Sequence, residues 1–129
     1  MRSQHLSIVI NRDVAEVYEF MAQPVNLPRW AAGLAQSEVR REAELLIADS
    51  PMGEVTFRFV PRNGLGVLDH DVTLPGGEVV TNHLRVITHP HGAEVIFTLR
   101  QLSMTDEEYE RDAAMVRADL VRLRDVLEA

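Results

Sequence analysis

The middle of this chain alternates between apolar and polar residues with period two, and this pattern constrains the fold more than any other feature. The alternation runs from about residue 36 to residue 102, and period two is typical of β-strands that bury one face. Turn-forming residues interrupt it at positions 42–44, 50–53, 63–64, 75–77 and 89–92, which predicts six strands. A further strand is predicted near the N-terminus, where Leu6, Ile8 and Ile10 alternate with other residues.

Helical spacing of apolar residues flanks the strand region on both sides. Residues 14–21 show it, with Asn and Asp before them as possible caps and Pro24 after them as a stop. Residues 28–32 allow a second short helix, because their proline suits a first helical turn. Residues 105–127 open with a Thr-x-x-Glu capping box and keep one apolar stripe. Together these patterns predict an α+β fold: a seven-stranded antiparallel sheet with two short helices and a long C-terminal helix.

Composition excludes several classes of function. The net charge is −7, from 13 basic and 20 acidic residues, which argues against binding to nucleic acid or to an acidic membrane surface. The chain has no cysteine and no lysine. Disulfides, thiolate metal sites, cysteine nucleophiles and lysine-anchored cofactors are therefore excluded. We predict no cofactor and no metal.

Length and hydropathy suggest one domain, covering residues 1–129. The apolar stretch near the N-terminus is too short for a signal peptide, and no apolar run approaches the ~20 residues that span a membrane. We therefore expect a cytoplasmic protein. The sequence leaves its oligomeric state open.

The turns predict how the strands pair. A two-residue turn at 63–64 would place Phe57 opposite His70, and a loop at 76–78 would place His70 opposite Leu84. A four-residue turn at 89–92 would place Leu84 opposite Phe97. On the other face, Asp69 would lie exposed between Arg58 and Arg85, with Asp71 beside His83, as an ion-pair ladder of little energetic weight.

His70 and Asn82 are the only polar residues in two neighbouring rows of the apolar face. As diagonal neighbours they would lie about 7 Å apart, close enough to share a ligand or a water. We expect His70 to face an internal cavity under the last helix and to be neutral near pH 7. The predicted ligand-binding residues are His70, Asn82, Phe57, Leu84, Phe97, Tyr109 and Val116, with Ala113 beside them.

Other candidate sites have simpler explanations. His89 and His91 have the spacing of metal ligands, but they flank a proline in a turn and lack a third ligand, which favours an exposed turn. Asp69 and Asp71 point away from His70 because side chains alternate along a strand. Trp30 is expected in the core or in a cavity wall. His70 itself is a structural core histidine, a ligand contact or a general acid or base.

The order of elements resembles the helix-grip fold of the START/Bet v 1-like (SRPBCC) superfamily, and in particular its polyketide cyclase/dehydrase-like branch. The segments that carry the resemblance are NLPRW at 26–30, GVLDHDV at 66–72, EVIFTL at 94–99 and MTDEE at 104–108. They look like a subgroup of small bacterial single-domain members. The resemblance implies a curved sheet that grips a helix around an apolar cavity, and it supplies no catalytic residue.

Three functions follow from these observations. The first is binding of a small hydrophobic ligand, lipid-like or polyketide-like, in a cavity between the sheet and the C-terminal helix. The second is a cofactor-independent cyclase or dehydratase that uses His70. The third is a protein-interaction module like the chaperone-activating relatives of the fold. Whether the protein is an enzyme stays open at this point.

Overall fold

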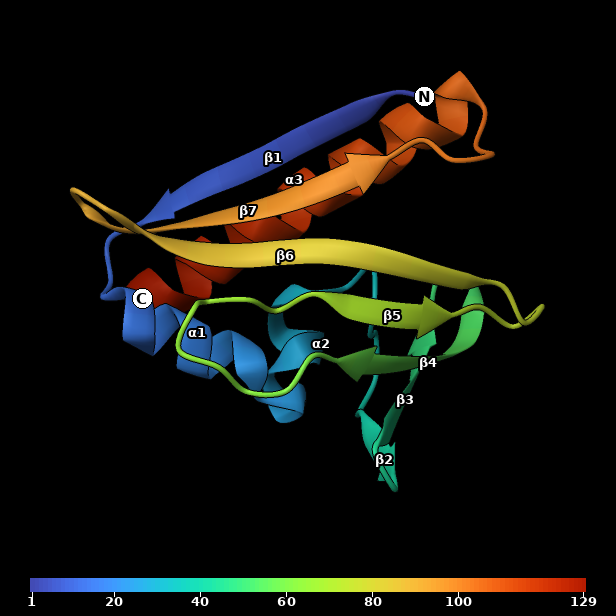
Figure 1. Ribbon diagram of the computed structural model, residues 1–129, viewed down its shortest axis with the longest axis horizontal. Coiled ribbons are helices and arrows are strands. Elements are labelled where there is room, and N and C mark those ends of the chain that lie inside the picture. Colours follow the sequence, from blue (N-terminus) through green and yellow to red (C-terminus); the bar gives the residue numbers. More distant parts are fainter.

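A seven-stranded antiparallel sheet forms the body of the protein (Figure 1), in a computed structural model that describes all of residues 1–129. Its strand order is β1-β7-β6-β5-β4-β3-β2. The strands are β1 (Ser3–Ile10), β2 (Arg40–Glu42), β3 (Leu45–Ser50), β4 (Gly53–Phe59), β5 (His70–Thr73), β6 (Val79–His89) and β7 (Gly92–Arg100). The predicted number and direction of the strands are confirmed, although β2 is shorter than the alternation suggests.

The helices lie where the sequence places them. They are α1 (Val14–Ala22), α2 (Leu27–Trp30) with the 3-10 turn η1 (Pro24–Asn26) before it, and α3 (Asp106–Glu128). Asp13 caps α1 by accepting a hydrogen bond from the Ala15 N–H, and Thr105 and Glu108 form the expected capping box of α3. No helix of the protein is long and apolar enough to cross a membrane.

The long helix α3 covers one half of the sheet. In Figure 1 it runs behind β1 and β7, and its main strand contacts are with β1. Its buried side chains join a single apolar core of 23 residues with both sheet halves and with α1 and α2. Strands β2–β5 curve away from α3, and α2 packs against that helix. This is the expected helix-grip architecture, with the concave face of the sheet turned toward the core.

The last hairpin has the predicted register. Val86 pairs with Val95 and Leu84 pairs with Phe97, so the turn at 89–92 was identified correctly. The expected alternation of buried and exposed residues is also present on β5, where His70 and Val72 are buried and Asp71 is exposed.

The two other predicted registers are wrong by two residues. Phe59, rather than Phe57, lies opposite His70 on β4. On β6 the residue opposite His70 is Asn82 rather than Leu84. A shift of two keeps every side chain on its predicted face, because side chains alternate with period two.

The amide of Asn63 explains the first error. Its Oδ1 accepts hydrogen bonds from the N–H groups of Leu65 and Val67, and its Nδ2 donates to the carbonyls of Pro61 and Val67. The side chain thus closes a loop between β4 and β5 instead of a two-residue hairpin turn. In Figure 1 this loop passes in front of α1, where the hydroxyl of Tyr18 accepts from the Asn63 N–H at 3.0 Å.

Candidate functional site

His70 is a buried histidine on the concave side of β5. Its residue surface is only 5% exposed, and this burial is the main reason that its pKa lies below the usual value. Its Nδ1 lies 3.0 Å from the carbonyl oxygen of Leu68. A carbonyl can only accept, so Nδ1 carries a proton, and the lowered pKa favours the neutral ring.

Asn82 is the partner of His70 on the neighbouring strand. The two residues are directly opposite each other, closer than the diagonal relationship that we expected. The amide Nδ2 of Asn82 lies 3.4 Å from Nε2 of His70 and donates to the free lone pair of that nitrogen. The structure therefore brings together the two polar residues that the sequence singled out, although the predicted register between them was wrong.

Phe59 completes the surroundings of His70, and the sequence analysis did not select it. Its ring centroid lies 4.7 Å from that of the imidazole, with the two rings tilted by 44°. Phe57, which we expected in this position, packs edge-on against Phe59 at 5.9 Å. The residue was missed because the assumed hairpin turn placed Phe59 opposite Leu68.

The remaining predicted site residues contribute to the apolar core. Phe57, Leu84 and Tyr109 are fully buried there, whereas Phe97 and Val116 are partly buried against it. The hydroxyl of Tyr109 donates to the carbonyl of Leu99 at 3.2 Å. That hydroxyl proton is thus already used within the protein.

Trp30 carries another buried polar atom. Its Nε1 is inaccessible to solvent and has no hydrogen-bond partner. An orphaned buried donor of this kind costs about 1–3 kcal/mol. The sequence suggested only that Trp30 would belong to the core or to a cavity wall, and nothing in the pattern indicated an unpaired donor.

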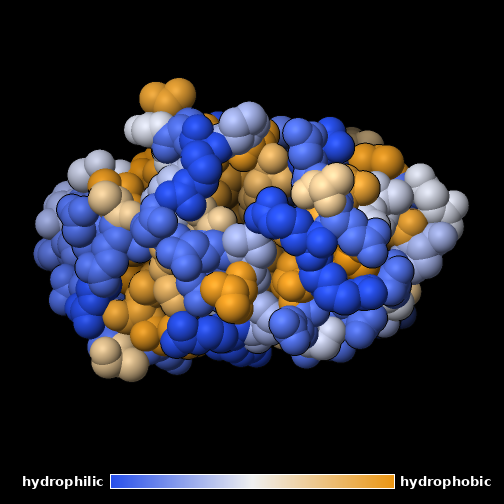
Figure 2. Space-filling view, turned by 90° about the horizontal axis from the view of Figure 1, so that it is seen from below, coloured by the Kyte–Doolittle hydropathy of each residue, from blue (hydrophilic) through white to orange (hydrophobic).

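His70 and Asn82 line neither of two open hollows on the surface. One, of about 550 Å³, lies between Arg29 and the C-terminal half of α3. The other, of about 590 Å³, lies between α1, the β4–β5 loop and the end of β6. Figure 2, which views the molecule from below, shows the apolar surface of that side divided into separate patches by polar residues.

Asp69 corrects our expectation for the outer face. Its side chain is only 13% exposed, and it accepts hydrogen bonds from Arg85, His83 and the Leu84 N–H. The Arg85 guanidinium, more than any other group, holds the pKa of this carboxyl well below its usual range.

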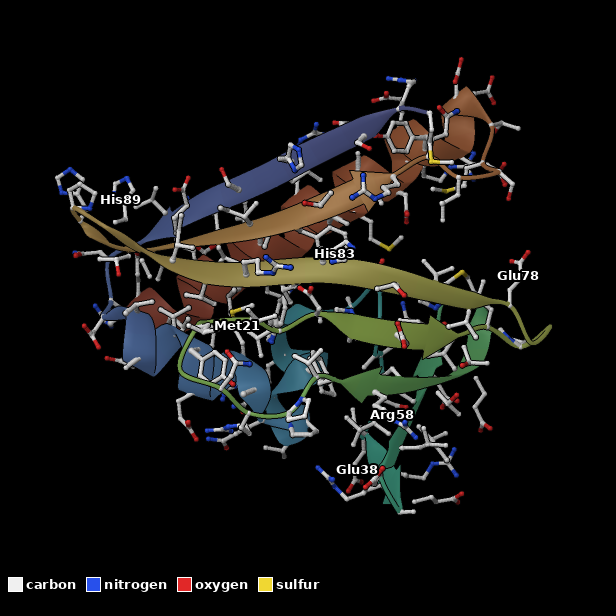
Figure 3. The ribbon with its side chains drawn as sticks, in the orientation of Figure 1. Met21, Glu38, Arg58, Glu78, His83 and His89 are labelled. Carbon is white, nitrogen blue, oxygen red and sulfur yellow. The ribbon has the colours of Figure 1, made fainter.

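The other members of the expected outer row are arranged differently. Arg58 lies opposite Asp71 on β4 rather than beside Asp69. Asp71 accepts a hydrogen bond from the Thr81 hydroxyl at 2.5 Å. His83, expected beside Asp71, instead contacts Asp69. Figure 3 labels His83 on β6 and Arg58 on β4.

The turn histidines contact each other at the tip of the β6–β7 hairpin. The His89 ring nitrogen Nδ1 accepts from the backbone N–H of His91 at 3.0 Å, and their ring centroids are 5.6 Å apart. No group of three or more His, Cys, Asp or Glu side chains is arranged to hold a metal ion.

Comparison with solved structures establishes the fold. No family model and no curated protein matches the chain in sequence. The protein XoxI from Bacillus cereus superposes with a TM-score of 0.76 at 14% identity, with 100% of this chain and 99% of that chain covered. The Aha1 dimer from Colwellia psychrerythraea gives 0.76 at 15%, with 99% and 97% covered.

A third structural neighbour is DynU16, a protein in the dynemicin biosynthetic locus. It superposes with a TM-score of 0.75 at 15% identity. The match covers 98% of this chain and 47% of DynU16, so the present chain corresponds to about half of that protein. These likenesses agree with a START/Bet v 1-like architecture.

Proposed function

We propose that this protein binds a small hydrophobic ligand, lipid-like or polyketide-like, between the concave face of the sheet and α3, as a member of the polyketide cyclase/dehydrase-like branch. One observation carries the proposal. His70 and Asn82 form a polar pair on a mainly apolar face, and the hydrogen bond between them is long, at 3.4 Å, so it offsets only part of the cost of burying them. DynU16, with the same fold, is a protein in the dynemicin biosynthetic locus.

The neutral state of His70 fits a binding role, because no ion has to be desolvated when an apolar molecule enters.

The first test identifies what the protein carries. Native mass spectrometry of protein purified without denaturation, followed by extraction, should reveal a bound apolar small molecule. The apolar fluorophore N-phenyl-1-naphthylamine should also bind saturably, with one molecule per chain.

The second test separates a binding role of His70 from a structural one. For a binding role, His70→Phe should weaken fluorophore binding about three- to tenfold and keep or raise the melting temperature. The control is His5→Phe on the outer face of β1, where the ring is exposed, and it should leave affinity unchanged. A lower melting temperature with unchanged affinity for His70→Phe would show that His70 is merely structural.

A further inference from the structure

The hydrogen bonds of His70 define what its free nitrogen can recognise. The Leu68 carbonyl accepts a hydrogen bond from Nδ1 at 3.0 Å, and the donor Nδ2 of Asn82 faces Nε2, which fits a neutral ring whose Nε2 has a lone pair and no proton. In this tautomer the ring offers one kind of contact to a molecule beside Nε2, namely acceptance of a hydrogen bond.

Asn82 places a donor next to this acceptor, and the hydrogen bond between the two is weak. The separation of 3.4 Å between Nδ2 and Nε2 is longer than the usual 2.9–3.0 Å. The Asn82 side chain has no other hydrogen-bond partner in the protein, and it is only half-buried. Breaking this one hydrogen bond costs little, since a long hydrogen bond is a weak one.

We propose that the ligand carries a hydroxyl group, alcoholic or phenolic, which donates to Nε2 of His70 and accepts from Nδ2 of Asn82. This inference rests on the proposed function and specifies its ligand class. A hydroxyl both donates and accepts through one oxygen, which is what an acceptor beside a donor requires. A ketone or an ether lacks the proton for Nε2, and an ammonium group lacks a lone pair for Asn82.

The charges near the pair favour a neutral hydroxyl over an anion. Asp69 and Asp71 flank His70 along the chain and act on it as negative charges, with His83 as the other titratable group that acts on it. The hydrogen bonds of the pair involve no arginine. A carboxylate ligand would thus be desolvated without a cation to compensate for it. The tilted Phe59 ring against the imidazole suits an apolar body attached to the hydroxyl.

Three naphthalene probes of similar size test the inference: 2-naphthol, 2-methoxynaphthalene and 2-methylnaphthalene. We expect 2-naphthol to bind about three- to tenfold more tightly than the other two, the net effect of a made hydrogen bond. The ¹⁵N resonance of His70 Nε2 should move when 2-naphthol is added and stay in place with 2-methylnaphthalene. His70→Phe should abolish the preference, and Asn82→Leu serves as the second variant if His70→Phe does not fold.

The outcomes distinguish failure of this inference from failure of the proposed function. Equal affinity for the three probes overturns the hydroxyl inference and leaves hydrophobic ligand binding intact. Tight binding of 2-methoxynaphthalene shows that only an acceptor is recognised, and it overturns the role of Nε2. A proton found on Nε2 in the free protein does the same. If no probe binds, both proposals fail together.

Discussion

The carboxylate of Asp69 accepts two hydrogen bonds from the guanidinium of Arg85, at 3.0 Å from Nε and 2.7 Å from Nη2. The same carboxylate also accepts from His83 Nδ1 and from the Leu84 N–H, both at 2.9 Å. Asp69 therefore joins the loop before β5 to β6 through four contacts. The guanidinium and the carboxylate form a bidentate pair, which is stronger than an ion pair with a single contact.

We predict that Asp69→Asn lowers the free energy of unfolding by about 1–2 kcal/mol. The new amide would turn an N–H group toward donors that need an acceptor. Urea denaturation at pH 7 measures the effect. Asp71→Asn is the matched control, because Asp71 is exposed and its only side-chain partner is the Thr81 hydroxyl. Similar losses in the two variants would contradict the special position of Asp69.

The stabilisation from Asp69 should depend on pH. Hydrogen bonding to Arg85 lowers the pKa of this carboxyl in the folded state, so the unfolded chain binds more protons below about pH 4. The contribution is fully present above the unfolded pKa and is lost as the pH falls toward the folded one. The difference in unfolding free energy between wild type and Asp69→Asn should shrink by about 1 kcal/mol between pH 5 and pH 3. A difference that stays constant would refute the linkage.

Replacement by asparagine should have opposite effects on stability at two aspartates of α3. Burial raises the pKa of both Asp112 and Asp119, so ionisation of either one costs stability above its folded pKa. Asp119 accepts hydrogen bonds from Arg122 Nη1 at 2.9 Å and from the Gly33 N–H at 3.1 Å, whereas Asp112 makes no side-chain hydrogen bond. At pH 7, Asp112→Asn should stabilise by about 0.5 kcal/mol after solvent screening, and Asp119→Asn should destabilise by about 1 kcal/mol. Thermal and urea unfolding of both variants would reveal a shift in the same direction if this account is wrong.

Gly66 should not tolerate a side chain. Its φ is +72°, and an added Cβ would lie 2.1 Å from the carbonyl oxygen of Val86. Gly66→Ala should therefore cost at least about 2 kcal/mol. Gly64→Ala in the same loop should change stability by less than about 1 kcal/mol, because its added Cβ meets nothing within 4 Å. Equal melting temperatures for the two variants would contradict the close approach of the loop to β6.

The sequence predicted the elements better than it predicted their pairing. Period two, the capping box at Thr105 and the turn at 89–92 are local signals, and the fold confirms them. The register around His70 depends on Asn63, whose amide bonds to its own loop rather than forming a tight turn. Asn-Gly in sequence is compatible with both conformations, so the choice between them could not be read from it.

The positions of the candidate residues were predicted only in part for the same reason. Alternation placed His70 and Asn82 on the buried face. That inference depends only on which residues alternate along each strand, and not on how the strands pair. Their direct pairing and the contact with Phe59 need the register, which was off by two. The hydrogen bond of His70 to Leu68 and the low exposure of Asp69 depend on how the chain enters β5, and no residue pattern encodes that path.

The pairing of β1 with β7 has a consequence for the order of assembly. Ser3 lies opposite Arg100, so β1 pairs with a strand that lies far from it along the chain. Hairpins such as β3–β4 and β6–β7 can close locally, whereas β1 joins only after a long loop has been closed. Pulse-labelled hydrogen exchange should therefore protect the amides of β1 later than those of β3 and β4, and earlier protection would exclude this order. We therefore expect β1 to be the last strand to join the sheet.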